Sequence, residues 1–181
     1  YNSIGAMGTA ARWDKNEVKP PEYFPIDQYQ GTRSEDPYSV AKWIGEQVGD
    51  AFARRNPDMS IGSMRFNGMW DDEKFKELNK NPISNAWERC QGFWTYLHIK
   101  DAATACRMAV EKPNWKGHEK FFLNAKDTMI TIETMEAIKI VYPDVELREE
   151  IAGHNAPLKI DLAKEKFDWE PKFSWRDSIF G

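Results

Sequence analysis

Hydrophobic side chains recur at helical spacing in one long stretch of the chain. The residues concerned are Val40, Ile44, Val48, Ala51 and Phe52. Their spacing is that of one face of an α-helix. Asp36 can cap this helix, and Pro37 suits its first position because proline has no backbone N–H to leave unpaired there. Pro57 stops the run, so the pattern predicts a helix over 36–55.

Shorter runs predict the remaining elements. We expect a strand end at 1–8 and strands at 59–66, 93–99, 119–124 and 145–151, with helices at 71–79, from Asp101 to Pro113, from Thr131 to Tyr142, and at 161–167. The order strand, helix, strand around 36–55 favours a parallel sheet with a crossover helix, and therefore an α/β fold. Residues 9–33 lack periodicity and contain three prolines, which predicts a long surface loop.

Composition excludes several classes of protein. The 181 residues are 41% hydrophobic and 30% charged, enough for one substantial core, and the net charge of −4 includes no long run of either sign. We therefore predict no nucleic-acid or anionic-membrane partner, and no membrane span or signal sequence, which fits a cytoplasmic protein. Cys90 and Cys106 lack CxxC spacing, and the histidines form no ligand set, so no disulfide framework or metal site is expected.

Tyr38 and Lys42 lie four residues apart on the predicted helix, so their polar ends can meet on one face. A tyrosine with its ordinary pKa near 10 is a poor base at neutral pH, and a nearby ammonium stabilises the phenolate. Lowering a tyrosine pKa to roughly 6–7 takes about 4–5 kcal/mol, more than one exposed charge supplies. A second cation is implied, and an oxidised nicotinamide ring would provide it.

A simpler interpretation of Tyr38 and Lys42 is a partly buried tyrosine beside a solvated lysine. The same spacing recurs at Tyr96 and Lys100, within a predicted strand. Four residues of strand span about 13 Å, so the side chains of that second pair cannot meet. Geometry therefore selects Tyr38 and Lys42 as the candidate pair.

The motifs around this pair resemble a known family. They are, in order, Tyr1-Asn-Ser-Ile-Gly-Ala-Met-Gly8, Pro37-Tyr-Ser-Val-Ala-Lys42, Met64-Arg-Phe-Asn-Gly68, Tyr96-Leu-His-Ile-Lys-Asp101, Phe121-Phe-Leu-Asn124 and Trp169-Glu-Pro171. Together they resemble the extended short-chain dehydrogenase/reductase family, which includes NAD-dependent sugar epimerases, dehydratases and uronate dehydrogenases. The chain contains no G-x-G-x-x-G pattern, and the resemblance implies that a complete member carries a Gly-rich cofactor-binding half before Tyr1.

The resemblance implies roles for the residues of the first two motifs. Tyr38 would be the general acid/base, Lys42 would stabilise its phenolate and hold the nicotinamide ribose, and Ser3 would orient the substrate hydroxyl. Gly5 would lie beside the substrate. The alternative for Ser3 alone is a turn serine that bonds its own backbone.

The resemblance also places the residues after the strand at 59–66 beside the cofactor. Arg65, Phe66 and Asn67 would contact NAD, and Asn67 would also contact the substrate. Arg89 lies in a region that varies with substrate in the family, where it could meet a carboxylate or phosphate, although a surface arginine is the simpler alternative.

The fold implied is α/β, the C-terminal part of a Rossmann-type doubly wound parallel sheet with a small α/β substrate-binding lobe. Residues 1–68 and 93–125 would form the second half of the NAD-binding domain, and 69–92 and 126–181 the lobe. In the resembling family the helix corresponding to 36–55 commonly forms a homodimer interface. Its small residues Ala41, Gly45 and Gly49 fit that role, or equally close packing within the monomer.

The function implied is NAD-dependent epimerisation or dehydrogenation at a sugar or nucleotide-sugar hydroxyl carbon, with NADP as a possible cofactor instead. In the dehydratases of the resembling family an acidic pair commonly follows the Ser or Thr of the first motif. Here Ser3 is followed by Ile4 and Gly5, which argues against a dehydratase. Two alternatives stay open: a non-catalytic interaction domain on the same fold, and an NADP-dependent carbonyl reductase.

Overall fold

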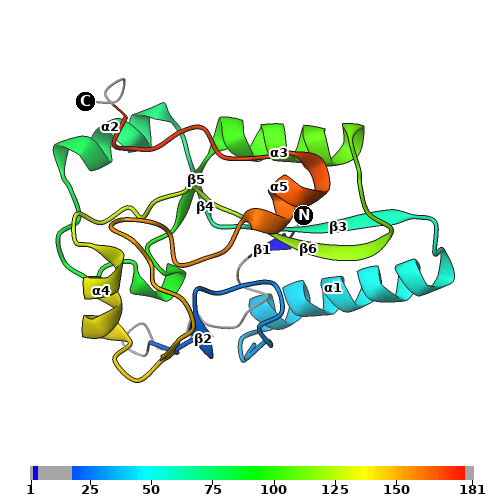
Figure 1. Ribbon diagram of the computed structural model, residues 1–181, viewed down its shortest axis with the longest axis horizontal. Helices are drawn as coiled ribbons and strands as arrows, with labels where there is room; N and C mark the ends of the chain where they lie inside the picture. Colours follow the sequence, from blue (N-terminus) through cyan, green and yellow to red (C-terminus); the bar gives the residue numbers. More distant parts are fainter. Residues whose placement is uncertain (1, 4–17, 178–181) are drawn as a thin grey trace.

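The computed structural model describes residues 18–177 and the backbone of residues 2–3, and it shows a mixed α/β fold (Figure 1). Its elements are β1 (Asn2–Ser3), β2 (Tyr23–Phe24), α1 (Pro37–Arg55), β3 (Ser60–Phe66), β4 (Gly68–Trp70), α2 (Asp72–Lys80), the 3-10 turn η2 (Cys90–Gly92), β5 (Tyr96–His98), α3 (Ile99–Glu111), β6 (Gly117–Leu123), α4 (Thr134–Val141), β7 (Glu146–Leu147) and α5 (Asp161–Phe167). Asp36 caps α1 by accepting from the Ser39 N–H, as the sequence predicts.

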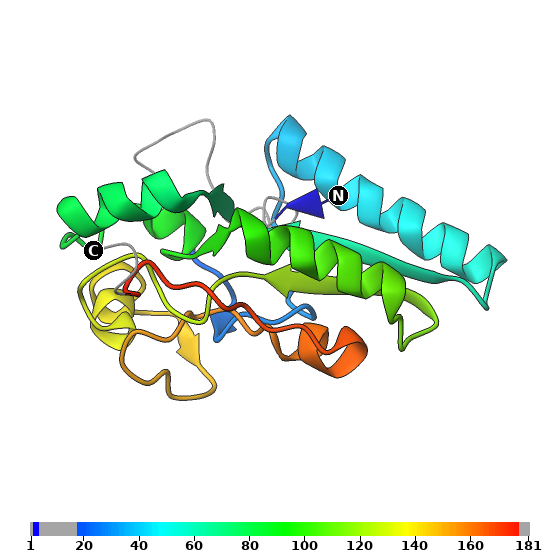
Figure 2. The same cartoon turned by 90° about the horizontal axis from the view of Figure 1, so that it is seen from above.

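A parallel sheet in the order β1-β3-β6 forms the centre of the fold. The full length of β3 pairs with β6, from Ser60 opposite Gly117 to Phe66 opposite Leu123. Helix α1 connects β1 to β3 and covers one face of the sheet, while α3 and α5 cover the other (Figure 2). The predicted parallel α/β arrangement with a crossover helix is therefore confirmed.

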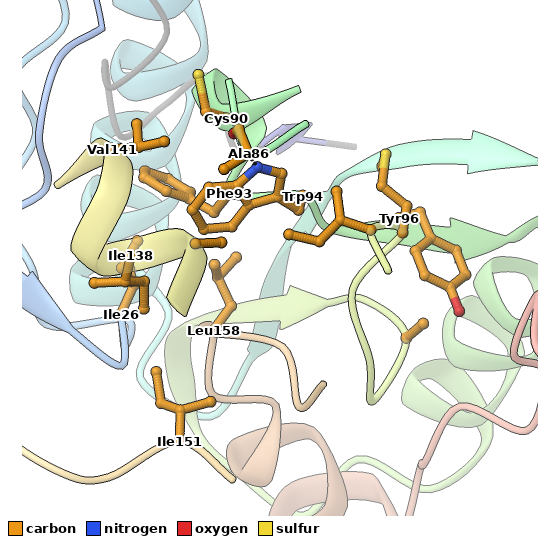
Figure 3. Packing of buried hydrophobic residues seen from close by; sticks show 14 of the residues in the cluster. Ile26, Ala86, Cys90, Phe93, Trp94, Tyr96, Ile138, Val141, Ile151 and Leu158 are labelled. Carbon is orange, nitrogen blue, oxygen red and sulfur yellow. Dashed lines mark hydrogen bonds between the residues drawn. The ribbon is translucent and has the colours of Figure 1, made fainter. Parts of the chain in front are cut away.

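A second core lies beyond the sheet, where the short pairs β4-β5 and β2-β7 meet α2 and α4. Its centre is aromatic: Phe24, Phe93 and Trp94 are fully buried around Tyr142, with ring centroids 5.5–5.9 Å from that tyrosine. Figure 3 shows Phe93 and Trp94 within this core. Because residues 23–24 form β2 and Phe24 and Ile26 are fully buried, the prediction of a surface loop over 9–33 is wrong for 23–26.

The predicted strand at 93–99 starts later in the structure and has a different partner. The strand expected at 93–99 begins only at Tyr96, because Phe93 and Trp94 adopt left-handed φ angles of 55° and 56° that an extended chain excludes. This strand also pairs with β4 rather than joining the main sheet.

The caps of α3 and α4 also differ from expectation. His98, not Asp101, caps α3, and its Nδ1 accepts the Lys100 N–H. Helix α4 begins at Thr134 with Glu133 at the cap position, two residues after the predicted cap, because the Thr131 hydroxyl donates instead to the carbonyl of Ile83 at 3.3 Å. In both places, the side-chain oxygen that the sequence pattern assigns to the helix cap is bonded instead to a distant part of the chain.

Asp101 fastens the C-terminal segment to α3. Its buried carboxylate accepts the backbone N–H groups of Lys172 and Phe173 at 3.0 and 3.1 Å. Burial raises the pKa of Asp101 above its ordinary value, although these two hydrogen bonds act in the opposite direction. The folded chain therefore binds a proton more readily than the unfolded chain at this position, and it loses stability as pH rises from the unfolded value of 3.8 through the higher folded value.

Asp101→Asn is expected to leave the free energy of unfolding at neutral pH equal to or above that of the parent, because an amide oxygen accepts the same two bonds without a buried charge. Asp101→Ala, which removes the acceptor, is expected to cost about 1.5–3 kcal/mol. Urea denaturation at neutral and acidic pH measures both. A neutral-pH loss in Asp101→Asn as large as that in Asp101→Ala would contradict the raised pKa.

Candidate active site

Helix α1 packs on the sheet with its polar face inward. Ser39 and Glu46 are its buried residues, whereas Ile44, Val48 and Phe52 are each about half exposed. Amphipathic helices of globular proteins normally bury the apolar face. The reversed orientation means that polar contacts attach α1 to β3 and β6.

Glu46 and Arg65 form the central contact between α1 and the sheet. The Arg65 Nε and Nη2 atoms each lie 2.8 Å from a different oxygen of the Glu46 carboxylate. Both side chains are buried, with exposed fractions of 5% for Arg65 and 1% for Glu46. The guanidinium carbon lies 5.0 Å from the ring centroid of Phe122. Arg65 is thus engaged with α1, and its predicted contact with a cofactor stays a prediction.

One helical turn further along α1, Asp50 makes the next contact. Its carboxylate lies 2.8 Å from Nδ1 of His118, and Nε2 of His118 lies 2.7 Å from the Ser63 hydroxyl. A Cβ on Gly49 would come within 2.8–3.0 Å of the His118 ring. Gly49 therefore serves close packing within the monomer, whereas Gly45 has nothing within 4 Å of an added Cβ.

The contacts between α1 and β3 recur at matching intervals along the helix and the strand. The four-residue step of about 6 Å along α1, from Glu46 to Asp50, matches two strand residues of about 6.6 Å, from Arg65 back to Ser63. The same step in the other direction leads from Glu46 to Lys42 and from Arg65 to Asn67. We infer that Lys42 and Asn67 lie at the same level, that is, at the same distance along the strand direction, toward the C-terminal edge of the sheet.

Tyr38 and Lys42 approach each other at the N-terminal end of α1. The Lys42 Nζ lies 5.3 Å from the Tyr38 ring centroid, and Tyr38 is 37% exposed. The structure therefore brings together the two side chains that the spacing selects. Tyr96 and Lys100 have separate partners, since the Tyr96 hydroxyl donates to Asp127 at 2.5 Å and Lys100 pairs with Asp72 at 3.0 Å.

A buried polar side chain directly after β3 has no hydrogen-bond partner among the described residues. Asn67 is 7% exposed, and within the described part of the chain neither its amide nitrogen nor its amide oxygen has a hydrogen-bond partner. Asn124 directly follows Leu123, the partner of Phe66 in the ladder, and its buried side-chain oxygen is also unpaired there. Such groups in native structures indicate a water or ligand contact. Asn124 had no predicted role, although its place at a strand end was visible in the sequence.

The remaining predicted site residues lie elsewhere or outside the described residues. The backbone of Ser3 pairs with Phe66, so β1 ends at the same edge of the sheet; its side chain and Gly5 are outside the described residues. Phe66 is buried in the core beneath α3. Arg89 lines a separate pocket of about 300 Å³ together with Trp70, Lys74 and Asn81, among others.

Within residues 18–177, no group of three or more His, Cys, Asp and Glu side chains could hold a metal ion. His98 is fully buried and stacks on Phe173, with Nε2 2.8 Å from Asp72, so its role is structural. No helix of the described chain is long and apolar enough to cross a membrane.

The sequence matches no protein-family model and no curated protein. Solved structures, by contrast, share the fold over nearly the whole chain. UDP-glucose 4-epimerase from Bifidobacterium longum, in complex with NAD+ and UDP, matches 96% of this chain with a TM-score of 0.57 and 13% identity. UDP-glucuronic acid 4-epimerase from Bacillus cereus, in complex with NAD, matches 99% with a TM-score of 0.57 and 14% identity.

A dehydratase has the same fold. dTDP-glucose 4,6-dehydratase from Bacillus anthracis, in complex with NAD, matches 98% of this chain with a TM-score of 0.54 and 14% identity. The chain spans 57–58% of the length of these three proteins. At this level of identity the likeness establishes the Rossmann-like fold of the NAD-dependent epimerases and dehydratases, as the sequence predicts.

Proposed function

We propose that the protein is part of an NAD-dependent epimerase or dehydrogenase that acts at a hydroxyl carbon of a sugar or nucleotide sugar. The observation that carries this proposal is the approach of Lys42 to Tyr38 at the start of α1. This end of a crossover helix follows the C-terminal end of β1, and ligands of doubly wound α/β folds bind along that edge of the sheet.

The proposed reaction needs a base for the sugar hydroxyl and an acceptor for hydride. NAD, when bound, supplies the acceptor. Tyr38 takes the hydroxyl proton as phenolate and returns it as phenol, and Lys42 stabilises the phenolate. Ser3 orients the reacting oxygen. An epimerase returns the hydride to the same carbon, whereas a dehydrogenase releases reduced cofactor and a carbonyl product.

The side chain of Asn67 indicates whether a cofactor and a substrate suit this edge of the sheet. Its amide, which has no partner among the described residues, offers one donating and one accepting group that would bind a carboxamide or a sugar hydroxyl. Lys42 and Asn67 would border the nicotinamide nucleoside, with Arg65 behind them, whereas Phe66 is buried beneath α3 and would support this edge of the sheet from the other face. Residues 1–68 and 93–125 would form the cofactor-binding part, and 69–92 with 126–181 a lobe that binds the remainder of the substrate through Arg89.

The experiment is NAD titration of the complete natural protein by calorimetry, followed by assay of reduced-cofactor release and sugar epimerisation with UDP-glucose and UDP-glucuronic acid. Binding of NAD together with turnover of either sugar supports the proposal. Binding of neither NAD nor NADP would refute it and favour a non-catalytic interaction domain.

We also propose that two copies associate through the outward face of α1. Ile44, Val48 and Phe52 expose an apolar stripe there, and the neighbouring Ala41 and Gly45 allow a second helix to approach closely. An exposed apolar stripe of this kind indicates a protein contact.

Val48→Asp is expected to convert a dimer of the complete protein to monomers, because the interface would bury an unpaired carboxylate. Light scattering coupled to gel filtration measures this change. Val110→Asp is the matched control, since Val110 is 82% exposed on α3, away from the stripe. A wild-type monomer, or a Val48→Asp dimer, would contradict the proposed interface.

A further inference from the structure

The paired strands β3 and β6 separate directly after their last ladder pair, Phe66 and Leu123. Beyond that pair, Tyr96 of β5 lies between the two chains: it is the ladder partner of Gly68, and its carbonyl accepts the Ala125 N–H at 2.7 Å. Neighbouring strands lie about 4.8 Å apart. The space between the two chains therefore widens from about one strand spacing to about two as the chains leave the ladder.

Asn67 and Asn124 lie where the two chains separate. Each directly follows the last paired residue of its strand. Alternation along an extended chain places their side chains on the sheet face that carries Arg65 and Phe122. This is the face that α1 covers, since the Arg65 guanidinium contacts both Glu46 oxygens. The two amides therefore share one face of the sheet, at its C-terminal edge.

Three polar atoms of these two side chains have no hydrogen-bond partner in the part of the chain that the structure describes: Nδ2 and Oδ1 of Asn67, and Oδ1 of Asn124. The orientation of the Asn124 amide is fixed, because its Nδ2 donates to the carbonyl of Ala125 at 2.8 Å. Both residues are buried, so bulk water does not solvate these atoms. Buried atoms of this kind indicate a bound water or ligand group. To pair all three, that group must accept one hydrogen bond and donate two.

A primary carboxamide matches this requirement. Its oxygen can accept from Asn67 Nδ2, while its NH₂ group can donate one hydrogen bond to Asn67 Oδ1 and the other to Asn124 Oδ1. A sugar hydroxyl has a single O–H to donate, so it leaves one of the two oxygens unpaired. The nicotinamide ring of NAD carries a primary carboxamide, and ligands of doubly wound α/β folds bind along this edge of the sheet.

We propose that Asn124 is a cofactor-binding residue that, together with Asn67, binds the carboxamide group of the nicotinamide ring. The inference rests on the proposed function, which brings NAD to this edge of the sheet. The Asn124 oxygen accepts the second N–H of the carboxamide, so the pair selects an NH₂ group over any substituent that cannot donate.

The 3-acetylpyridine analogue of NAD tests the proposal, because its methyl ketone keeps the accepting oxygen and lacks both N–H donors. Calorimetric titration of the complete protein with NAD and with the analogue measures the two dissociation constants. We expect the parent to bind NAD about 10-fold or more tightly than the analogue, which leaves two buried oxygens unpaired. Equal affinity for the two compounds would overturn the proposal.

Asn124→Leu assigns the preference to Asn124, because leucine is close to asparagine in volume and lacks the accepting oxygen. We expect the affinity for NAD to fall about 10-fold, while the affinity for the analogue stays within about twofold of the parent value. Asn124→Ala removes the same oxygen and is expected to give the same result, which covers a failure of Asn124→Leu to fold. Asn114→Leu is the matched control, since Asn114 is exposed, and it should change neither constant. An unchanged preference for NAD in either folded variant would mean that Asn124 binds a buried water only, and the proposal would be wrong.

The titrations separate this inference from the proposed function. If the parent binds NAD and turns over a sugar but does not discriminate against the analogue, the role of Asn124 is wrong and the enzyme assignment stands. If the preference depends on Asn124 but no sugar is turned over, the carboxamide contact stands and the sugar reaction is wrong. Binding of neither compound would refute both.

Discussion

Tyr38→Phe is expected to lower turnover of the complete protein by about 10²–10⁴-fold while leaving its affinity for NAD largely unchanged. The substitution removes only the hydroxyl that exchanges a proton with the substrate. The ring remains, and so does its contact with Lys42, which lies 5.3 Å from the ring centroid. Steady-state kinetics with the active sugar and calorimetric titration with NAD measure the two quantities separately.

Tyr29→Phe is the control for this prediction, because Tyr29 is 80% exposed and lies outside α1. It is expected to change neither quantity. Turnover of Tyr38→Phe equal to that of the parent would remove Tyr38 from the mechanism. An equal loss of turnover and NAD affinity would instead indicate that the hydroxyl mainly holds the cofactor.

Local signals in the sequence were sufficient for α1 and for the main strands. Asp36 and Pro57 mark the two ends of the helix, and the apolar run at 59–66 corresponds to β3. The approach of Tyr38 to Lys42 also follows from spacing alone, because residues four apart on a helix must lie on one face. Each of these predictions depends on interactions between residues close in sequence.

Interactions across the fold explain what the sequence did not reveal. Spacing identifies the apolar stripe of α1 but cannot show that it faces outward, because the inward attachment depends on Glu46 meeting Arg65 nineteen residues away. Similarly, Asp101 has the pattern of a helix cap, yet its carboxylate binds a segment about seventy residues later. The neighbouring position of Asn124 and Asn67 becomes visible only once β3 and β6 are paired.

The two faces of α1 have different proposed roles. The inner face fixes the helix to the sheet through Glu46 and Asp50 and thereby sets the level of Lys42. The outer face exposes the stripe of Ile44, Val48 and Phe52. A change on the outer face should therefore alter association with little effect on Tyr38, whereas a change on the inner face should alter both stability and the site.

Glu46→Leu is accordingly expected to lower the free energy of unfolding by about 3–5 kcal/mol, because it leaves the buried Arg65 guanidinium without its carboxylate. Adding Arg65→Met should restore most of that loss, since two apolar side chains then replace the two charges. Urea denaturation at neutral pH measures both variants.

Lys74 and Glu77 on α2 form the exposed counterpart of this pair, since both side chains are more than half exposed and lie 2.5 Å apart. Glu77→Ala is expected to change stability by less than about 1 kcal/mol, because water already solvates both charges. The two pairs differ in burial and in geometry, since Arg65 contacts both Glu46 oxygens whereas Lys74 contacts one oxygen of Glu77. If Glu46→Leu costs no more than Glu77→Ala, water reaches the Arg65 guanidinium in solution. The contact that sets the level of Lys42 would then be too weak to position it.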